Sequence, residues 1–140
     1  MKSDATNTLA LSLEVLELGW NSADGSRFAQ PFADDADFVD IRGDHHRGQA
    51  MIANGHDAIF ASIYKASRIT YAVVDARHLS DDVILGHARS TLVAPSGPLA
   101  GTHVALASVV LLRSGPQWKI AAFHNSLVMQ PSASPRGADA

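Results

Sequence analysis

The stretch ITYAVVDARHL-SDD-VILGHARSTLVA, residues 69–94, decides the fold of this chain, and residues 103–113 (HVALASVVLLR) and 117–129 (QWKIAAFHNSLVM) continue its pattern. All four segments are long, rich in β-branched residues and alternate with period 2, which is typical of strands. Short runs of Ser, Asp, Gly and Pro, the residues that favour turns, separate them. Long consecutive strands joined by short turns predict an antiparallel meander.

The residues before this meander are spaced as in helices. An apolar stripe predicts a first helix that ends near Gly19, and Asp24 is placed to cap a short second helix. Residues 49 to about 66 again show helical spacing and predict a third helix. The residues on the apolar faces are Leu9, Leu13, Leu16 and Trp20 in the first helix, widened by Leu11, Val15 and Leu18; Phe28 and Phe32 in the second; and Ile52, His56, Ile59, Phe60 and Ile63 in the third.

Between the second and third helices the pattern predicts a polar turn at 34–35, a strand at 36–41 and a hairpin-like loop at 42–48. Three helices that precede one sheet must cover one of its faces. We therefore expect an α+β fold, a cone-shaped barrel of a curved antiparallel sheet packed against three N-terminal helices, with an apolar pocket between the two layers. Residues 1–130 form this single domain, and the Pro/Ser/Gly/Ala-rich residues 131–140 are expected to be disordered.

The composition narrows the classes of function. Hydrophobic residues make up 46% of the chain and charged residues 18%, as in ordinary globular proteins. A net charge of −3 without a basic run argues against nucleic acid and acidic membranes as partners. The absence of cysteine excludes disulfides and thiolate chemistry. We expect a cytoplasmic protein, because the sequence shows neither a signal peptide nor the ~18 consecutive apolar residues of a membrane span.

Four segments occur in a characteristic order: Gly19-Trp20-Asn21, FADDADFV at 32–39, Arg47-Gly48, and WKIAAFHN at 118–125. In this order they resemble the nuclear transport factor 2-like superfamily and, within it, the SnoaL-like branch that includes the SgcJ/EcaC group. The resemblance covers nearly the whole chain and implies the cystatin-like, ketosteroid isomerase-like form of the cone, with homodimers formed through the outer face of the sheet. The superfamily includes isomerases, cyclases, dehydratases and epoxide hydrolases as well as non-catalytic binding proteins, so fold alone leaves the function open.

Asp40 is the first candidate catalytic residue, because its position resembles that of the catalytic base in ketosteroid isomerases. A carboxylate at the mouth of an apolar cavity has its pKa raised by desolvation, which suits it to move a proton next to a carbonyl. The alternative is a strand-end aspartate that accepts hydrogen bonds from the loop amides of residues 42–44. The two hydrogen-bond donors of the isomerase mechanism fall on Leu16 and near Val110, so this chain lacks both.

The other candidate catalytic residues are His87 and Arg89, which share one face of their strand, and His124 near the end of the last strand. Alternation alone leaves open whether His87 and Arg89 face the pocket or the outer surface. His124 has the parity of Ile120 and is expected to face the apolar interior. Asn125 has the parity of residues that suggest the outer face, and we keep it among the candidate pocket residues.

The remaining candidates line the predicted pocket, and none of the histidines has the spacing or carboxylate partner typical of a metal site. We therefore expect neither a metal nor another cofactor. Two functions remain open: an enzyme that moves a proton on a hydrophobic carbonyl compound, as an isomerase, cyclase or dehydratase, or a non-catalytic protein that binds a hydrophobic small molecule. The candidate lining residues are Trp20, Phe28, Phe32, Phe38, His56, Phe60, Tyr64 and Asn125.

Overall fold

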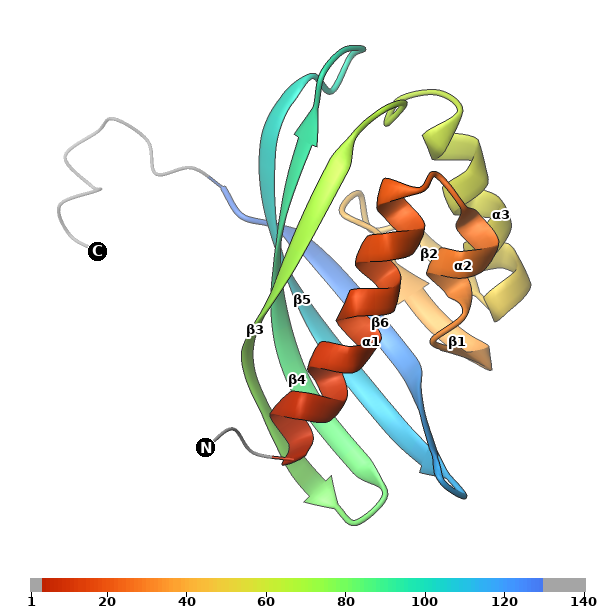
Figure 1. The fold of residues 1–140 in the computed structure, drawn as a ribbon, viewed down its shortest axis with the longest axis vertical. Helices are drawn as coiled ribbons and strands as arrows, with labels where there is room; N and C mark the ends of the chain where they lie inside the picture. Colours follow the sequence, from red (N-terminus) through yellow and green to blue (C-terminus); the bar gives the residue numbers. More distant parts are fainter. Residues whose placement is uncertain (1–3, 130–140) are drawn as a thin grey trace, which may run out of the picture.

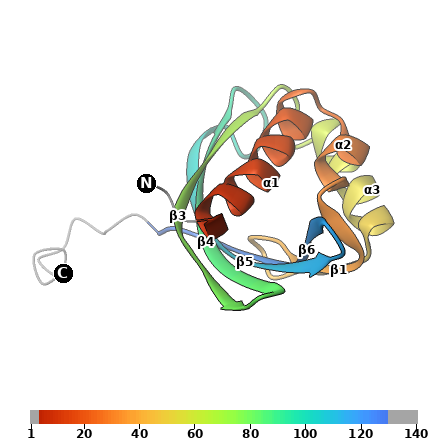
Figure 2. The same ribbon diagram turned by 60° about the horizontal axis from the view of Figure 1, so that its bottom comes forward.

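The structure is a computed structural model that describes residues 4–129 (Figure 1). Over these residues three helices lie on the concave side of one curved, unclosed sheet (Figure 2), which confirms the predicted α+β cone. The predicted disordered tail, 131–140, lies outside the described residues. The elements are α1 (Asp4–Asn21), α2 (Gly25–Ala29), β1 (Phe32–Val39), β2 (His45–Arg47), α3 (Gln49–Phe60), β3 (Arg68–Ser80), β4 (Val83–Ala94), β5 (Gly101–Ser114) and β6 (Gln117–Leu127).

The last four strands form the predicted meander, in which each strand pairs antiparallel with the next. The full strand order is β2-β1-β6-β5-β4-β3. The sheet is extended by β1, which pairs in parallel with β6, and by β2, which pairs antiparallel with β1. The parallel pairing brings the end of β1 beside the end of β6, so residues far apart in sequence meet at one edge of the cone.

The segment from Phe32 to Val39 is a single strand, and two predictions made there were wrong. Phe32 begins this strand rather than ending the second helix, and Asp34 and Asp35 lie within the strand rather than in a turn. The register of β1 against β6 shifts between Phe32 and Asp37, and both aspartates are exposed at this irregularity. Pairing with a strand distant in sequence overrides the local polar signal.

Two helix predictions were wrong: the width of the buried face of α1 and the end of α3. Leu11 and Leu18, expected to widen the buried stripe of α1, are 65% and 57% exposed. At about 100° per residue they point away from the face that holds Leu9 and Leu16. α3 ends at Phe60 rather than near residue 66, and the chain continues in turns up to β3. The predicted cap of α2 is confirmed, since the Asp24 carboxylate accepts a hydrogen bond from the Arg27 amide at 3.1 Å.

The α1–α2 contact is unusually close. A Cβ added to Gly19 would lie 2.4 Å from the backbone nitrogen of Phe28, so only glycine permits this approach. The contact fixes Phe28 against Trp20 at the wide end of the cone, where the rings of Phe38 and Phe123 also stack with centroids 5.2 Å apart. No helix within residues 4–129 is long and apolar enough to cross a membrane.

Candidate functional site

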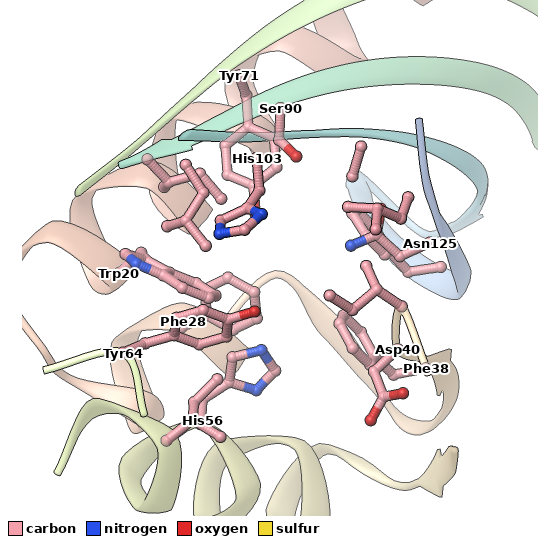
Figure 3. Close-up of a pocket in the computed structure, with 17 residues that line it drawn as sticks. Trp20, Phe28, Phe38, Asp40, His56, Tyr64, Tyr71, Ser90, His103 and Asn125 are labelled. Carbon is pink, nitrogen blue, oxygen red and sulfur yellow. The ribbon is translucent and has the colours of Figure 1, made fainter. Parts of the chain in front are cut away.

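A cavity of about 80 Å³ lies between the helices and the sheet at the wide end of the cone (Figure 3). It forms where β1, β4 and β6 end and where β3 and β5 begin, under the C-terminal end of α1 and beside α3. Most of its wall is aromatic or aliphatic. The lining residues are Trp20, Phe28, Phe38, Asp40, Ile41, His56, Ile59, Tyr64, Ile69, Tyr71, Ser90, Leu92, His103, Ala105, Phe123, Asn125 and Leu127.

His56 is a buried polar residue that lines the cavity. Its side chain is held by a hydrogen bond from Nδ1 to the carbonyl of Ile52, one turn earlier in α3, at 2.8 Å, and its ring stacks on Phe28 with centroids 4.0 Å apart. Burial lowers the pKa of His56 to about 4, so the ring is neutral at physiological pH. Because Nδ1 carries the proton, Nε2 keeps its lone pair, and it has no hydrogen-bond partner among the described residues.

His103 is fixed in a similar way on the opposite side of the cavity, at the start of β5. Its Nε2 donates to the carbonyl of Leu99 at 2.7 Å, which leaves the lone pair on Nδ1. Figure 3 shows His56 on the α3 side and His103 on the sheet side. The cavity therefore contains two imidazoles whose tautomers are set by backbone carbonyls.

Further polar side chains line the cavity, and the Tyr64 hydroxyl, the Ser90 hydroxyl and the Asn125 amide make no hydrogen bond to another described residue. Burial raises the pKa of Tyr64, so its hydroxyl stays protonated. The indole N–H of Trp20 is different, because it donates to the Ser67 hydroxyl at 2.9 Å.

Asp40 lines the rim of the cavity, but hydrogen bonds within the 40–46 segment occupy its carboxylate. Oδ1 accepts from the amides of Arg42 (2.9 Å) and Asp44 (3.0 Å), and Oδ2 lies 3.0 Å from His46 Nε2. Burial raises the pKa of Asp40, but the hydrogen bonds from His46 and the two amides outweigh it and hold the pKa below its usual value. The expectation of a raised pKa was therefore wrong, and in Figure 3 the carboxylate points away from the middle of the cavity.

A SnoaL-like domain model matches residues 16–130. The chain belongs to the SnoaL-like domain family. Among solved structures, it is similar to an uncharacterised protein with a cystatin-like fold from Caulobacter vibrioides, with a TM-score of 0.80, 21% identity, and coverage of 98% of this chain and 95% of that chain. It also resembles a ketosteroid isomerase-like protein from Erwinia carotovora atroseptica, with a TM-score of 0.74 and 13% identity over 92% of this chain and 100% of that chain. No curated protein matches this SnoaL-like domain.

A third similar structure is a candidate dehydratase of the nuclear transport factor 2-like family from Streptomyces avermitilis, with a TM-score of 0.69 and 17% identity over 89% of this chain and 96% of that chain. The family and fold predicted from the sequence are thus confirmed, whereas the narrower SgcJ/EcaC group remains a prediction. Identities this low establish the common fold alone.

Two candidate catalytic residues of this SnoaL-like domain, His87 and Arg89, lie on the outer face of β4 and do not reach the cavity. The inward face of β4 carries the buried Ala88 and Ser90 instead. His87 Nδ1 pairs with Asp75 Oδ1 at 2.7 Å on the outer surface. The open question of the strand's orientation is thus resolved against a pocket role for both residues.

His124 was expected to face the interior and is exposed on the outer face, so that expectation was wrong. The reason is a bulge in β6: Val110 pairs with Ala122 and Leu111 with Ile120, which leaves Ala121 as an extra residue. One extra residue exchanges the two faces for the rest of the strand. Asn125 therefore lines the cavity, as proposed, although its parity suggested otherwise.

The other pocket predictions divide by depth. Trp20, Phe28, Phe38, His56 and Tyr64 line the cavity as expected. Phe32 and Phe60 do not line it, because they lie in the packed core behind it. Sequence reasoning missed Ser90 and His103 as lining residues, and only the inward parity of Ser90 with Ala88 and Leu92 could have indicated its place.

The positions of the missing isomerase donors are also clear. Leu16 is fully buried in the core. Val110 pairs with Leu85 and Ala122 on the outer face of the sheet, so its side chain points away from the cavity. Neither position supplies a hydrogen-bond donor to a ligand.

A groove of about 260 Å³ adjoins the cavity between α3 and the 38–46 segment. Phe38, Asp40, His56 and Ile59 line both spaces, so the cavity and the groove adjoin at these side chains. The groove also contains His46 and Arg42, whose guanidinium lies 3.5 Å from the Asp44 carboxylate. The residues described form no group of three or more His, Asp or Glu side chains that fits a metal ion.

Proposed function

We propose that this SnoaL-like domain binds a small, mostly hydrophobic molecule in the cavity between α3 and the sheet. The observation that supports this function is the combination of an aromatic wall with several polar groups that have no partner among residues 4–129. These groups remain accessible within the cavity, so a bound molecule with matching polar atoms can form hydrogen bonds to them. Apolar pockets with a few convergent polar groups are the usual form of small-molecule sites.

Binding without proton transfer is favoured over catalysis by Asp40. A general base needs a lone pair that reaches the substrate, and the Asp40 oxygens already accept hydrogen bonds from two amides and His46. Its lowered pKa also makes it a weaker base. The expected partners His87 and His124 lie outside the cavity, so the proton-transfer site predicted from the sequence is not assembled.

A second candidate function is proton transfer on a hydrophobic carbonyl compound, as in an isomerase, cyclase or dehydratase, with His56 as the base in place of Asp40. The free Nε2 of His56, with Tyr64 lining the same cavity, supports it. Its weakness is basicity, because a group with a pKa of about 4 accepts a proton poorly near neutral pH.

The test is native mass spectrometry of the purified protein, followed by identification of any released small molecule. Retention of a hydrophobic molecule by the wild type, and its loss when the cavity is filled by Ser90→Phe, supports the binding function. Leu11→Phe, a substitution on the exposed face of α1, is the control that keeps the molecule. If the same molecule remains bound to both variants, the cavity is not its site. Steady turnover of a carbonyl substrate that is lost in His56→Phe would favour the enzyme instead.

The outer face of the sheet is the proposed homodimer interface. It carries apolar side chains that no described helix covers, and Val93 and Leu112 are 50% and 45% exposed. Leu106 lies on the same face, paired with Arg89. A glutamate at position 106 can therefore pair with the Arg89 guanidinium, so it should disrupt the interface without unfolding the monomer. We expect Leu106→Glu to shift the sedimenting species from dimer to monomer, and Leu11→Glu on α1 to leave it dimeric. A wild type that sediments as a monomer refutes the interface. Apolar residues of this face include Val83, Leu85, Val93, Val104, Leu106, Val110 and Leu112.

A further inference from the structure

The hydrogen-bonding character of the cavity is set by its two histidines. In each, one ring nitrogen donates to a backbone carbonyl: His56 Nδ1 to Ile52 at 2.8 Å and His103 Nε2 to Leu99 at 2.7 Å. A carbonyl oxygen only accepts, so the proton of each neutral ring is fixed on the bonded nitrogen. Burial lowers the pKa of His56 to about 4, so its ring is neutral and its other nitrogen, Nε2, is an acceptor. The cavity therefore presents the fixed lone pair of His56 to whatever it binds.

The charges of the lining disfavour an ionised ligand. None of the described residues that line the cavity is Lys or Arg, and Asp40 is an anion at the rim. Arg42, which lines the adjoining groove, is paired with the Asp44 carboxylate at 3.5 Å. A carboxylate or phosphate placed there would lose its hydration without a counter-ion, at a cost of several kcal/mol. An ammonium would also be poorly compensated, because the Asp40 oxygens are turned outward and already hydrogen-bonded.

The shape of the cavity favours a ring. Phe28 stacks on His56 on one side, and Phe38 stacks on Phe123 on another, so flat surfaces border the acceptor of His56. The space of about 80 Å³ is smaller than the roughly 150 Å³ that holds benzene in a dry protein cavity. The adjoining groove of about 260 Å³, which shares Phe38, Asp40 and His56 with the cavity, offers room for the remainder of one ring and its substituent.

Resting on the proposed binding function, the geometry points to a specific ligand class: a neutral single-ring compound with a free hydroxyl, a phenol or a ring enol, whose O–H donates to His56 Nε2. Tyr64 and Ser90, both able to donate or accept, line the same cavity and suit a second oxygen on the ring. At His56 the protein accepts the hydrogen bond, whereas the oxyanion-stabilising groups of an isomerase donate it.

Four matched probes test the class by titration calorimetry on the full chain at neutral pH: 4-methylphenol, 4-methylanisole, 4-methylbenzoate and 4-methylbenzylamine. They share a methylated ring and differ in whether the second group donates a hydrogen bond, only accepts one, or is charged. We expect 4-methylphenol to bind about ten-fold more tightly than 4-methylanisole, the effect of one buried hydrogen bond. The two charged probes are expected to bind more weakly than 4-methylphenol.

The variant His56→Phe keeps the stacked ring but removes the lone pair, so the preference for 4-methylphenol over 4-methylanisole is expected to fall to within about two-fold. His78→Phe, at an exposed histidine far from the cavity lining, is the matched control and retains the preference. If His56→Phe does not fold, the imidazole ¹⁵N spectrum of the wild type gives the same information, because only 4-methylphenol should shift the Nε2 resonance of His56.

Each result separates this inference from the proposed function. Equal affinity for 4-methylphenol and 4-methylanisole, or tightest binding of the benzoate or the amine, overturns the ligand class while the binding function stands. An unchanged preference in His56→Phe overturns the assignment of the acceptor. If none of the four probes binds, the ligand class is also overturned, and the molecule retained in native mass spectrometry decides the binding function separately.

Discussion

Replacing Gly19 by alanine tests whether the α1–α2 contact builds the cavity. The added methyl group would lie 2.4 Å from the nitrogen and 2.6 Å from the Cα of Phe28, both backbone atoms of α2. Backbone cannot rotate aside as a side chain can, so α2 must move away from α1. Overpacking of this kind costs about 1–3 kcal/mol. The helix propensity of alanine returns about 1 kcal/mol, so we expect a net loss of up to about 2 kcal/mol.

Gly55→Ala is the matched control, since Gly55 lies within α3 and a Cβ added there meets nothing within 4 Å. The same substitution should therefore stabilise the protein by about 0.5–1 kcal/mol. Urea unfolding followed by circular dichroism measures both variants, with equal m-values as the criterion that the denatured state is unchanged. The expected result is two shifts of opposite sign. If Gly19→Ala is as stable as Gly55→Ala, the close approach of α1 and α2 is not a constraint on this fold.

Three further predictions concern pH and buried hydrogen bonds. Burial lowers the pKa of His56 to about 4, so as pH falls the unfolded chain takes up a proton on this side chain before the folded chain does. The stability that the neutral His56 contributes, up to about 3 kcal/mol, should be complete above pH ~6.5 and be lost as pH falls toward 4. The variant His56→Phe should remove this part of the pH dependence of the free energy of unfolding. The pKa of Asp40 is also held below its usual value, so Asp40→Asn should cost about 1 kcal/mol at pH 7 and progressively less as the wild-type carboxylate protonates in acid; an equal cost at pH 7 and pH 2 would contradict this. Ser67→Ala should cost about 1–3 kcal/mol in urea unfolding because it leaves the Trp20 N–H unpaired, whereas the exposed Ser62→Ala should change stability by less than about 0.5 kcal/mol.

The sequence predicted the layers of the fold well because their signals are local. The alternating segments from Ile69 onward, and the helical spacing of Leu9, Leu13 and Leu16, reflect burial on one face of each element. The strand at Phe32–Val39 was only partly recognised, since what makes it a strand is its pairing with β6. Tertiary pairing of this kind leaves no periodic trace in the residues themselves.

The site was harder to predict because it depends on which face of each strand turns inward. For β4, alternation identified the pair His87 and Arg89 correctly as neighbours on one face but could not say which face. For β6, a single bulge at Ala121 placed Asn125 inside and His124 outside. His103 is held by the carbonyl of Leu99 in the turn before β5, a feature that spacing does not encode.

Asp40 shows why a shared fold does not carry a shared mechanism. The cone places a carboxylate at the cavity rim, as the resemblance to ketosteroid isomerases implied, but the next six residues determine what it does. Gly43, at φ 86°, closes a tight turn that directs the amides of Arg42 and Asp44 at one carboxylate oxygen, and His46 on β2 pairs with the other. The Asp40 carboxylate is poorly suited to remove a proton from carbon, because one of its oxygens accepts two amide hydrogen bonds and its pKa is lowered. In this chain the carboxylate instead holds the 40–46 segment beside the cavity and the groove. The hydrogen-bond acceptor available to a ligand is therefore the lone pair of His56 on α3 and not the carboxylate of Asp40.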